Sequence, residues 1–189
     1  MSTSPHIIVV AGNPKPRSRT LNAATALADA LAVGLWPDRP VVTTVVDLAT
    51  IADGLLAPWS LSDAGRAAAD DVRSAEVVIL ATPTYKASFT GLLKLFLDVL
   101  PAGSLSRTVV VPLVVSGGPG HRHLADLQLR PVLSELGAVV PTPSLLIEES
   151  ELPGLDGIAA AFVATQGPLL RATTAALATL PAEKRAARV

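Results

Sequence analysis

The sequence contains no cysteine and few aromatic residues. Without cysteine the chain cannot form disulfides, bind a metal through thiolates or use a thiol nucleophile. Phenylalanine, tryptophan and tyrosine together make up 3% of the residues, although half of the residues are hydrophobic. Alanine, valine and leucine must therefore build the core, and each aromatic residue merits individual inspection.

Strong net charge and long apolar runs are also absent. The formal net charge is -1, which gives no overall attraction to nucleic acid or to an anionic membrane. The longest apolar runs, such as Val109–Val115, are too short to span a bilayer. The first ten residues, MSTSPHIIVV, lack the basic region and the cleavage site of a signal peptide. We therefore expect a cytoplasmic protein that binds neither nucleic acid nor a membrane, and any anion site must be local.

Short apolar runs alternate with helical patterns along the chain, which is typical of repeated βα units around a parallel sheet. Since crossovers are right-handed and connections are short, few topologies remain. We predict an α/β fold, a flavodoxin-like three-layer sandwich with a five-stranded parallel sheet of order 2-1-3-4-5. One domain is expected over residues 1–189, with a core of 6–180 and a solvated tail at 181–189. The expected strands cover 6–11, 41–48, 76–83, 108–115 and 138–147, and the expected helices cover 20–34, 62–73, 91–100, 124–137 and 156–180.

Internal prolines and one glycine predict local irregularities in these elements. Pro112 predicts an irregular centre in the fourth strand, and Pro131 predicts a kink in the fourth helix. Prolines within 138–147 predict an interrupted fifth strand. Gly34 is expected just past the end of the first helix.

Three loops of unusual composition follow the first, third and fourth expected strands. Their sequences are GNPKPRSRT, TPTYKASFTG and SGGPGHRH. Ligands of open α/β sheets bind beyond the carboxyl ends of the strands, where the strand order reverses. We therefore expect these three loops to form one binding site.

The first loop combines positive charge with the start of a helix. Arg17 and Arg19 supply the charge, and the first amides of the helix add a partial positive charge. Ser18 and Thr20 can cap a helix that begins near Leu21. This combination predicts a site for one phosphate group, with a solvated basic loop as the alternative. Because neither G-x-x-x-x-G-K-[ST] nor G-x-G-x-x-G occurs, a phosphate monoester is favoured over a pyrophosphate or a triphosphate.

The second loop places aromatic and charged side chains directly after the third strand. Pro83 stiffens the turn, so that the backbone groups of Thr84, Tyr85 and Lys86 can be fixed against a planar heterocycle. The alternative is that Tyr85 and Phe89 are ordinary packing aromatics. The sequence of this loop allows both interpretations.

The third loop is rich in glycine and contains two histidines. Gly117 and Gly118 lack side chains, which would let the backbone approach a flat ligand. His121 and His123 are spaced i and i+2, which is a poor arrangement for chelating a metal. Ser116 lacks the first glycine of a nucleophile elbow, so a hydrolase triad is disfavoured. A phosphate at the first loop and a ring between the other two describe a mononucleotide with a large planar head, and FMN satisfies this description.

Three sequence blocks together resemble the flavodoxin-like NAD(P)H-dependent FMN reductases. The blocks are GNPKPRSRT, ATPTYKASFTGLLKLFLDVLP and SGGPGHRHLADLQLRPVLSELGA, and the resemblance covers residues 6–148. It is nearest to the group that supplies reduced flavin to two-component monooxygenases, including those of alkanesulfonate use. By this resemblance the flavin contacts fall on Asn13, Arg17, Ser18, Arg19 and Thr20 for the phosphate, on Pro83, Thr84, Tyr85 and Lys86 for the ring, and on Ser116, Gly117, Gly118 and His121 for the third loop.

The resemblance implies FMN as the flavin and hydride transfer from NADPH or NADH to flavin N5, with reduced flavin passed to a partner monooxygenase. Since the flavin performs the chemistry, no catalytic side chain is expected. Lys86 near N1 of the ring would favour anionic reduced flavin, and a solvated lysine is the alternative. Some members carry a tyrosine after the aspartate of the fourth helix, where Leu127 follows Asp126 here. The sequence is compatible with FMN as a released substrate and as a bound cofactor.

Two other functions use the same kind of flavin site. An FMN-bound reductase of quinones, azo dyes or metal oxyanions would differ only in its electron acceptor. A flavodoxin-type electron carrier would be more acidic and would hold the flavin between aromatics, for which Trp59 and Tyr85 are the candidates. The near-zero net charge makes the carrier the weaker alternative.

The helix LLKLFLDVLP predicts self-association. It carries Leu92, Leu93, Phe96 and Val99 or Leu100 on more than one side. A helix that is apolar this far around often packs against a second subunit as well as its own sheet. We therefore expect a homodimer or a homotetramer.

Overall fold

The computed structural model describes residues 4–56 and 60–180. Strands and helices alternate as the sequence predicts, and short 3-10 helices follow β2, β4 and β5. The strands are β1 (His6–Ala11), β2 (Val42–Asp47), β3 (Val77–Pro83), β4 (Val109–Ser116) and β5 (Leu145–Glu148). The α-helices are α1 (Arg19–Leu35), α2 (Asp63–Ser74), α3 (Gly91–Asp98), α4 (Leu124–Glu135) and α5 (Leu155–Thr179), and the 3-10 helices are η1 (Leu48–Thr50), η2 (Ala52–Leu55), η4 (Pro119–His121) and η5 (Glu149–Gly154).

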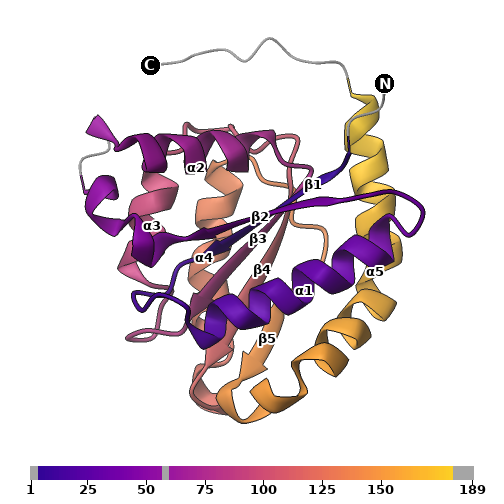
Figure 1. Cartoon of the computed structure of the whole chain (residues 1–189). Coiled ribbons are helices and arrows are strands. Elements are labelled where there is room, and N and C mark those ends of the chain that lie inside the picture. Colours follow the sequence, from indigo (N-terminus) through magenta and orange to yellow (C-terminus); the bar gives the residue numbers. More distant parts are fainter. Residues whose placement is uncertain (1–3, 57–59, 181–189) are drawn as a thin grey trace.

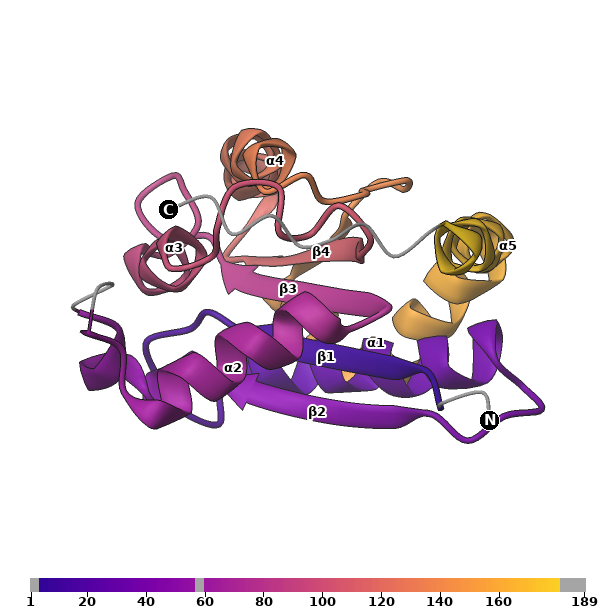
Figure 2. The same cartoon turned by 90° about the horizontal axis from the view of Figure 1, so that it is seen from above.

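The five strands form one parallel sheet of order β2-β1-β3-β4-β5, which confirms the predicted order. Helices α1 and α5 cover one face of the sheet, and α2, α3 and α4 cover the other, as Figures 1 and 2 show together. The strand order reverses between β1 and β3, which are direct neighbours in the sheet. This switch point places the loops after β1 and β3 side by side.

The core explains why the central strands are apolar on both sides. Every residue of β4 is buried, whereas β2 at the edge exposes Val42, Thr43 and Val45. Parallel strands with helices on both faces have no solvent side, so they read as continuous Val, Ile and Leu runs. Few aromatics are needed, and Phe96 is the largest fully buried side chain of the described residues.

Pro112 does not disturb the fourth strand, so that prediction is wrong. β4 is continuous through it, and Pro112 pairs in register with Leu80 of β3. On the other side, pairing with β5 begins only at Leu113, so no ladder hydrogen bond needs the missing N–H of the proline. The fifth strand is interrupted as predicted, since only an isolated bridge at Val139 precedes Leu145–Glu148.

Gly34 lies inside α1, so the prediction that it follows the end of the first helix is wrong. A Cβ atom at Gly34 would lie 2.2 Å from Cγ1 of Val163, so this glycine allows α1 to pack closely against α5. Helix α4 continues across Pro131. Trp59 and the predicted tail at 181–189 lie outside the described residues. Within the described residues, no helix combines the length and the apolarity needed to cross a membrane.

Candidate functional site

The three predicted loops lie together at the carboxyl ends of β1, β3 and β4, at the end of the sheet from which α1 starts (Figure 1). Backbone hydrogen bonds join the loops to neighbouring strands. The amide of Gly12 donates to the carbonyl of Ala81 at 2.8 Å, and the amide of Thr84 donates to the carbonyl of Val115 at 2.8 Å. The first and second loops therefore begin in positions fixed by the neighbouring strand.

Gly12 and Thr90 hold the start of the first loop against α3. The Thr90 hydroxyl donates to the Gly12 carbonyl and also accepts from the amide of Leu93, at 3.1 Å, as the N-cap of α3. Thr82 accepts from the amide of Thr90 at 3.2 Å. None of these three residues was predicted from the sequence. A glycine directly after the first strand and a threonine directly before the expected helix at 91–100 were usable signals for Gly12 and Thr90, whereas Thr82 had none.

One of the two caps that the sequence predicts is confirmed, and the helix starts two residues earlier than expected. Ser18 is the N-cap and its hydroxyl accepts from the amide of Leu21 at 3.2 Å, so α1 begins at Arg19. Thr20 is therefore not a cap but a buried residue of the first turn, and its hydroxyl accepts from Nδ2 of Asn13 at 3.2 Å. The amides of Arg19 and Thr20 have no carbonyl four residues earlier within the helix, which leaves them for an anion.

The charged side chains of the first loop differ in their surroundings. Arg19 forms an ion pair with Glu149 of η5 at 2.8 Å. In residues 4–56 and 60–180, neither Arg17 nor Lys15 forms a side-chain ion pair. The sequence could not rank these three cations, whereas the structure leaves Arg17 and Lys15 available to an anion and engages Arg19 elsewhere.

Arg17 also adopts a left-handed backbone, with a φ of 51°. Its amide donates to Oδ2 of Asp47 at 2.8 Å, and Asp47 is the last residue of β2. Non-glycine residues in this region carry strain and often occur at functional sites. Asp47 is another residue that the sequence analysis missed, although an acidic residue at the carboxyl end of a strand was a usable signal.

The second loop forms a tight turn from Tyr85 to Ser88. The amide of Tyr85 donates to Ser88 at 2.7 Å, and the amide of Ser88 donates back at 3.1 Å. Lys86 and Ala87 between them have φ values of 51° and 63°. Together with Arg17 these are all the non-glycine residues with positive φ in the described chain, and all lie in the first and second loops.

Of the two aromatic residues in the second loop, only one packs in the core. Tyr85 is 59% exposed and does not pack in the core, whereas Phe89 packs against the buried cluster beneath α3. Pro83 ends β3 and is partly buried, and Lys86 is exposed. Packing therefore accounts for Phe89 but leaves Tyr85 and Lys86 free to contact a ligand.

The third loop contains a buried hydroxyl without a partner. Ser116, the last residue of β4, is only 1% exposed, and its Oγ has no hydrogen-bond partner among the described residues. A Cβ atom at Gly117 or Gly118 would meet nothing within 4 Å, so no protein contact requires these glycines. A ligand with polar ring atoms could supply the hydrogen bond that this buried hydroxyl lacks.

His121 contributes its backbone to the connection between the loops. Its carbonyl accepts from the hydroxyl of Thr84 at 3.3 Å, while its side chain is exposed in η4. The next residue, Arg122, donates to the carbonyl of Leu146 at 2.9 Å and pairs with Glu148 at 3.3 Å. These contacts fix the second and third loops to each other and to the end of β5. In the described part of the chain no group of three His, Cys, Asp or Glu side chains is arranged to bind a metal.

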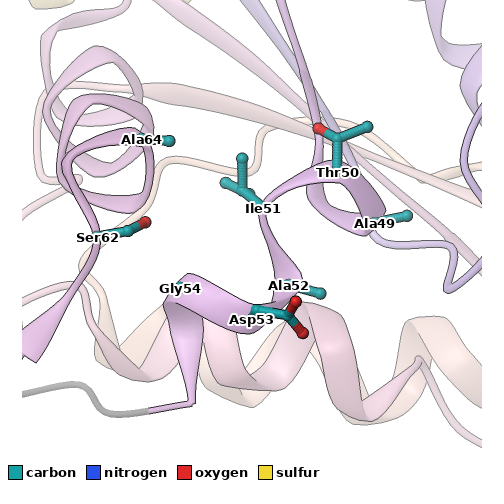
Figure 3. Close-up of a pocket in the computed structure, with 8 residues that line it drawn as sticks. All are labelled: Ala49, Thr50, Ile51, Ala52, Asp53, Gly54, Ser62 and Ala64. Atoms are coloured by element: carbon teal, nitrogen blue, oxygen red, sulfur yellow. The ribbon is translucent and has the colours of Figure 1, made fainter.

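A separate cavity of about 260 Å³ lies beside this site and contains none of the predicted residues. Figure 3 shows residues of η1 and η2 facing Ser62 and Ala64 at the start of α2. Its lining is Ala49, Thr50, Ile51, Ala52, Asp53, Gly54, Ser62 and Ala64.

The residues at the three loops fit a phosphorylated flavin. Free first-turn amides and the unpaired Arg17 match a phosphate, and the orphaned Ser116 hydroxyl matches a polar ring edge. Asn13, Ser18 and Thr20 support the loop from within. The arrangement therefore fits an anion at the first loop and a ring at the other two.

Comparison with known proteins agrees with this arrangement. The family model for NADPH-dependent FMN reductase matches residues 5–151. The chain is 37% identical over 86 residues to an FMN reductase (NADPH) of Pseudomonas putida, covering 46% of this chain and 44% of that relative, which is less than half of its length. It is 33% identical over 141 residues to an FMN reductase (NADPH) of Pseudomonas aeruginosa, covering 72% of this chain and 74% of that relative.

A solved structure shares the fold over nearly the whole chain. It is the apo form of an NADH:FMN oxidoreductase (EMOB), with a TM-score of 0.69 and 25% sequence identity. The superposition covers 96% of this chain and 92% of that chain. The similar proteins thus include enzymes named for each of the two nicotinamide donors.

Proposed function

This chain belongs to the NADPH-dependent FMN reductase family, and on that premise we propose that it reduces FMN with NADPH or NADH at the three-loop site. FMN, when bound, accepts a hydride at N5 from the nicotinamide. The observation that carries the proposal is what one edge of the sheet brings together: a helix N-terminus with free amides, Arg17 without an ion pair, and a buried Ser116 hydroxyl, the last two without a partner among residues 4–56 and 60–180.

The residues of the site divide into a phosphate end and a ring end. The amides of Arg19 and Thr20, with the guanidinium of Arg17, hold the phosphate. Asn13 and Ser18 keep the loop in shape through the hydrogen bonds described above. Arg19 contributes its backbone more than its side chain, because Glu149 holds the guanidinium.

The ring end is built mainly from backbone. Pro83, Thr84, Tyr85 and Lys86 present one side of the site, in a turn that has a single closed conformation. On the other side, Gly117 and Gly118 admit the ring closely, Ser116 supplies a hydroxyl, and His121 anchors the loop through its carbonyl. The protein orients the ring and shields one of its faces, and no side chain needs to move a proton.

Reduced flavin passes to a partner monooxygenase under this proposal. An exposed Tyr85 and a site formed by open loops favour exchange of flavin with solvent over permanent burial. The protein acts in the cytoplasm, as one FMN-binding domain. Discrimination between NADPH and NADH would depend on surfaces next to the ring. Comparing the oxidation rates of the two donors measures this preference.

A homodimer or homotetramer is also part of the proposal. Leu93 and Phe96 of α3 are buried in the protein's own core, whereas Leu92 and Val99 are only partly buried. A groove of about 410 Å³ lies between α3 and α4, lined by Lys94, Leu97, Asp98, Leu100, Ala102, Pro131, Val132, Glu135 and Leu136. Light scattering at micromolar concentration tests this, and a monomer would contradict it.

The deciding experiment follows NADPH and NADH oxidation at 340 nm with and without added FMN. Turnover that requires free FMN supports the proposal. Turnover by a yellow protein on quinones or azo dyes, without free FMN, would favour the acceptor-reductase alternative. An absence of pyridine-nucleotide oxidation by folded protein under all these conditions would overturn the assignment.

A further inference from the structure

The turn after β3 is held in a conformation that its residues do not favour. Lys86 and Ala87 both have positive φ, as in turns whose central positions usually carry Asn and Gly. Both have a Cβ atom, so the conformation carries backbone strain. A strained turn persists only where its surroundings impose it. Besides the two backbone hydrogen bonds between Tyr85 and Ser88, side-chain contacts from α4 hold this turn.

Gln128 of α4 contacts both halves of the turn with one side-chain amide. Its Nε2 donates to the carbonyl of Ala87 at 2.8 Å. Its Oε1 accepts from the hydroxyl of Ser88 at 2.6 Å. Ala87 and Ser88 are 41 and 40 positions away from Gln128 in the sequence, so these hydrogen bonds are tertiary contacts and not part of the local turn.

Buried side chains and an ion pair hold α4, and with it Gln128, in position. Ala125 and Leu129, on either side of Gln128 in the sequence, are fully buried against the sheet. Asp126 and Arg130 form an ion pair at 3.1 Å, and the hydroxyl of Ser144 bonds Asp126. Since α4 is anchored along its length, the position of Gln128 dictates the position of the turn.

We propose that Gln128 is a positioning residue for flavin binding: it holds the strained turn so that the backbone of Thr84, Tyr85 and Lys86 stays in its ligand-binding conformation. This inference rests on the proposed function, because the turn is the ring end of the flavin site. Gln128 touches neither the phosphate loop nor the Ser116 hydroxyl, so its effect is confined to the ring end.

The first test compares Gln128→Leu with Gln128→Glu by titrating FMN and riboflavin. Gln128→Leu removes both hydrogen bonds, and we expect roughly three- to tenfold weaker binding of both flavins by the same factor. Gln128→Glu keeps an acceptor for Ser88 but replaces the donor to Ala87 with a carboxylate oxygen that repels the Ala87 carbonyl, so it should also weaken the binding of both flavins. The visible absorption band of bound flavin should also shift in the Leu variant, because the ring's surroundings change. Gln166→Leu on α5, the same exchange at the other glutamine of the chain, should leave both affinities unchanged.

The second test is rescue by relief of strain. Ala87→Gly removes the Cβ that disfavours positive φ, so Gln128→Leu combined with Ala87→Gly should recover most of the lost affinity. The same pair can be followed without flavin, by thermal unfolding of the apoprotein. There Gln128→Leu should lower the melting temperature, and Ala87→Gly should reduce that loss.

The outcomes separate this inference from the proposed function. If the wild-type protein binds neither FMN nor riboflavin, the proposed function fails and this inference fails with it. If the wild type binds FMN but Gln128→Leu binds both flavins as tightly, only the positioning role is overturned. A variant that loses affinity but is not rescued by Ala87→Gly would also overturn the role, because the loss would then not arise from the strained turn.

Discussion

The hydroxyl of Thr90 donates a hydrogen bond to the backbone carbonyl of Gly12, which joins the start of α3 to the loop after β1. The two residues lie 78 positions apart in the sequence. The same hydroxyl caps α3 through the amide of Leu93, and the amide of Thr90 is itself bound by Thr82. One buried side chain therefore aligns the first loop with α3, the helix that follows the second loop.

Replacing Thr90 tests this alignment. Thr90→Val removes the cap and leaves the buried Gly12 carbonyl unpaired, so the free energy of unfolding should fall by about 2 to 3 kcal/mol. Thr90→Ser keeps the hydroxyl and should lose much less. Urea unfolding followed by circular dichroism measures both. Equal stability of the Val and Ser variants would show that the hydroxyl contributes nothing.

Gly12→Ala tests the close approach of the first loop to α3. The added Cβ would lie 2.6 Å from Cβ of Leu93, whose helix cannot retreat because it is packed on the sheet. Overpacking of this kind lowers stability by about 1 to 3 kcal/mol. Gly157→Ala in α5 is the matched control, since a Cβ there meets nothing within 4 Å and alanine is the better helix former. The control should therefore be neutral or stabilising in the same urea titration.

Arg17→Ala and Arg19→Ala should differ in their effect on FMN affinity. Arg17 has no ion-pair partner in the described part of the chain, whereas Arg19 is paired with Glu149 on the exposed surface. Loss of a charge-assisted phosphate contact at Arg17 should weaken FMN binding by about five- to thirtyfold, and riboflavin binding should not change. Arg19→Ala should have an effect of about threefold or less, because the phosphate contact proposed for Arg19 is its backbone amide, which the substitution keeps. Fluorescence titration at two salt concentrations checks both, and equal losses of riboflavin and FMN would refute the phosphate assignment.

Ser116→Ala should change stability and flavin affinity in opposite directions. The Ser116 hydroxyl is buried without a partner, so its removal should leave the apoprotein unchanged or more stable, by up to about 1 kcal/mol. If the flavin ring forms a hydrogen bond with that hydroxyl, the Ser116→Ala variant should bind both FMN and riboflavin roughly three- to tenfold more weakly.

Thr142→Val is the control for this pair of measurements. Thr142 also has a buried hydroxyl without a partner among the described residues, but it lies before β5 and outside the three loops. Its replacement should leave flavin affinity unchanged. A Ser116→Ala variant that binds flavins as well as the wild type would remove Ser116 from the site.

The sequence predicted the architecture because periodicity reports local structure. Continuous Val and Ile runs, such as those of β3 and β4, are recognisable without knowing their neighbours. The prediction failed at Pro112 and Gly34, where a neighbouring element decides the outcome. A gap in β5 pairing makes the missing N–H of Pro112 harmless, and close packing of α5 explains Gly34 inside a helix. Neither partner can be identified from the local pattern.

By itself, the sequence determined that a βα-repeat domain would bring three unusual loops to one edge of a sheet, and it predicted an anion site at the first of them. Tertiary structure decided which side chains are free to do so. It paired Arg19 with Glu149, left Arg17 and the buried Ser116 hydroxyl without partners in the part of the chain that the structure describes, and placed Gln128 against a turn some forty residues away. Charge and turn chemistry are local properties of the sequence, whereas the availability of a side chain depends on contacts that only the folded chain creates.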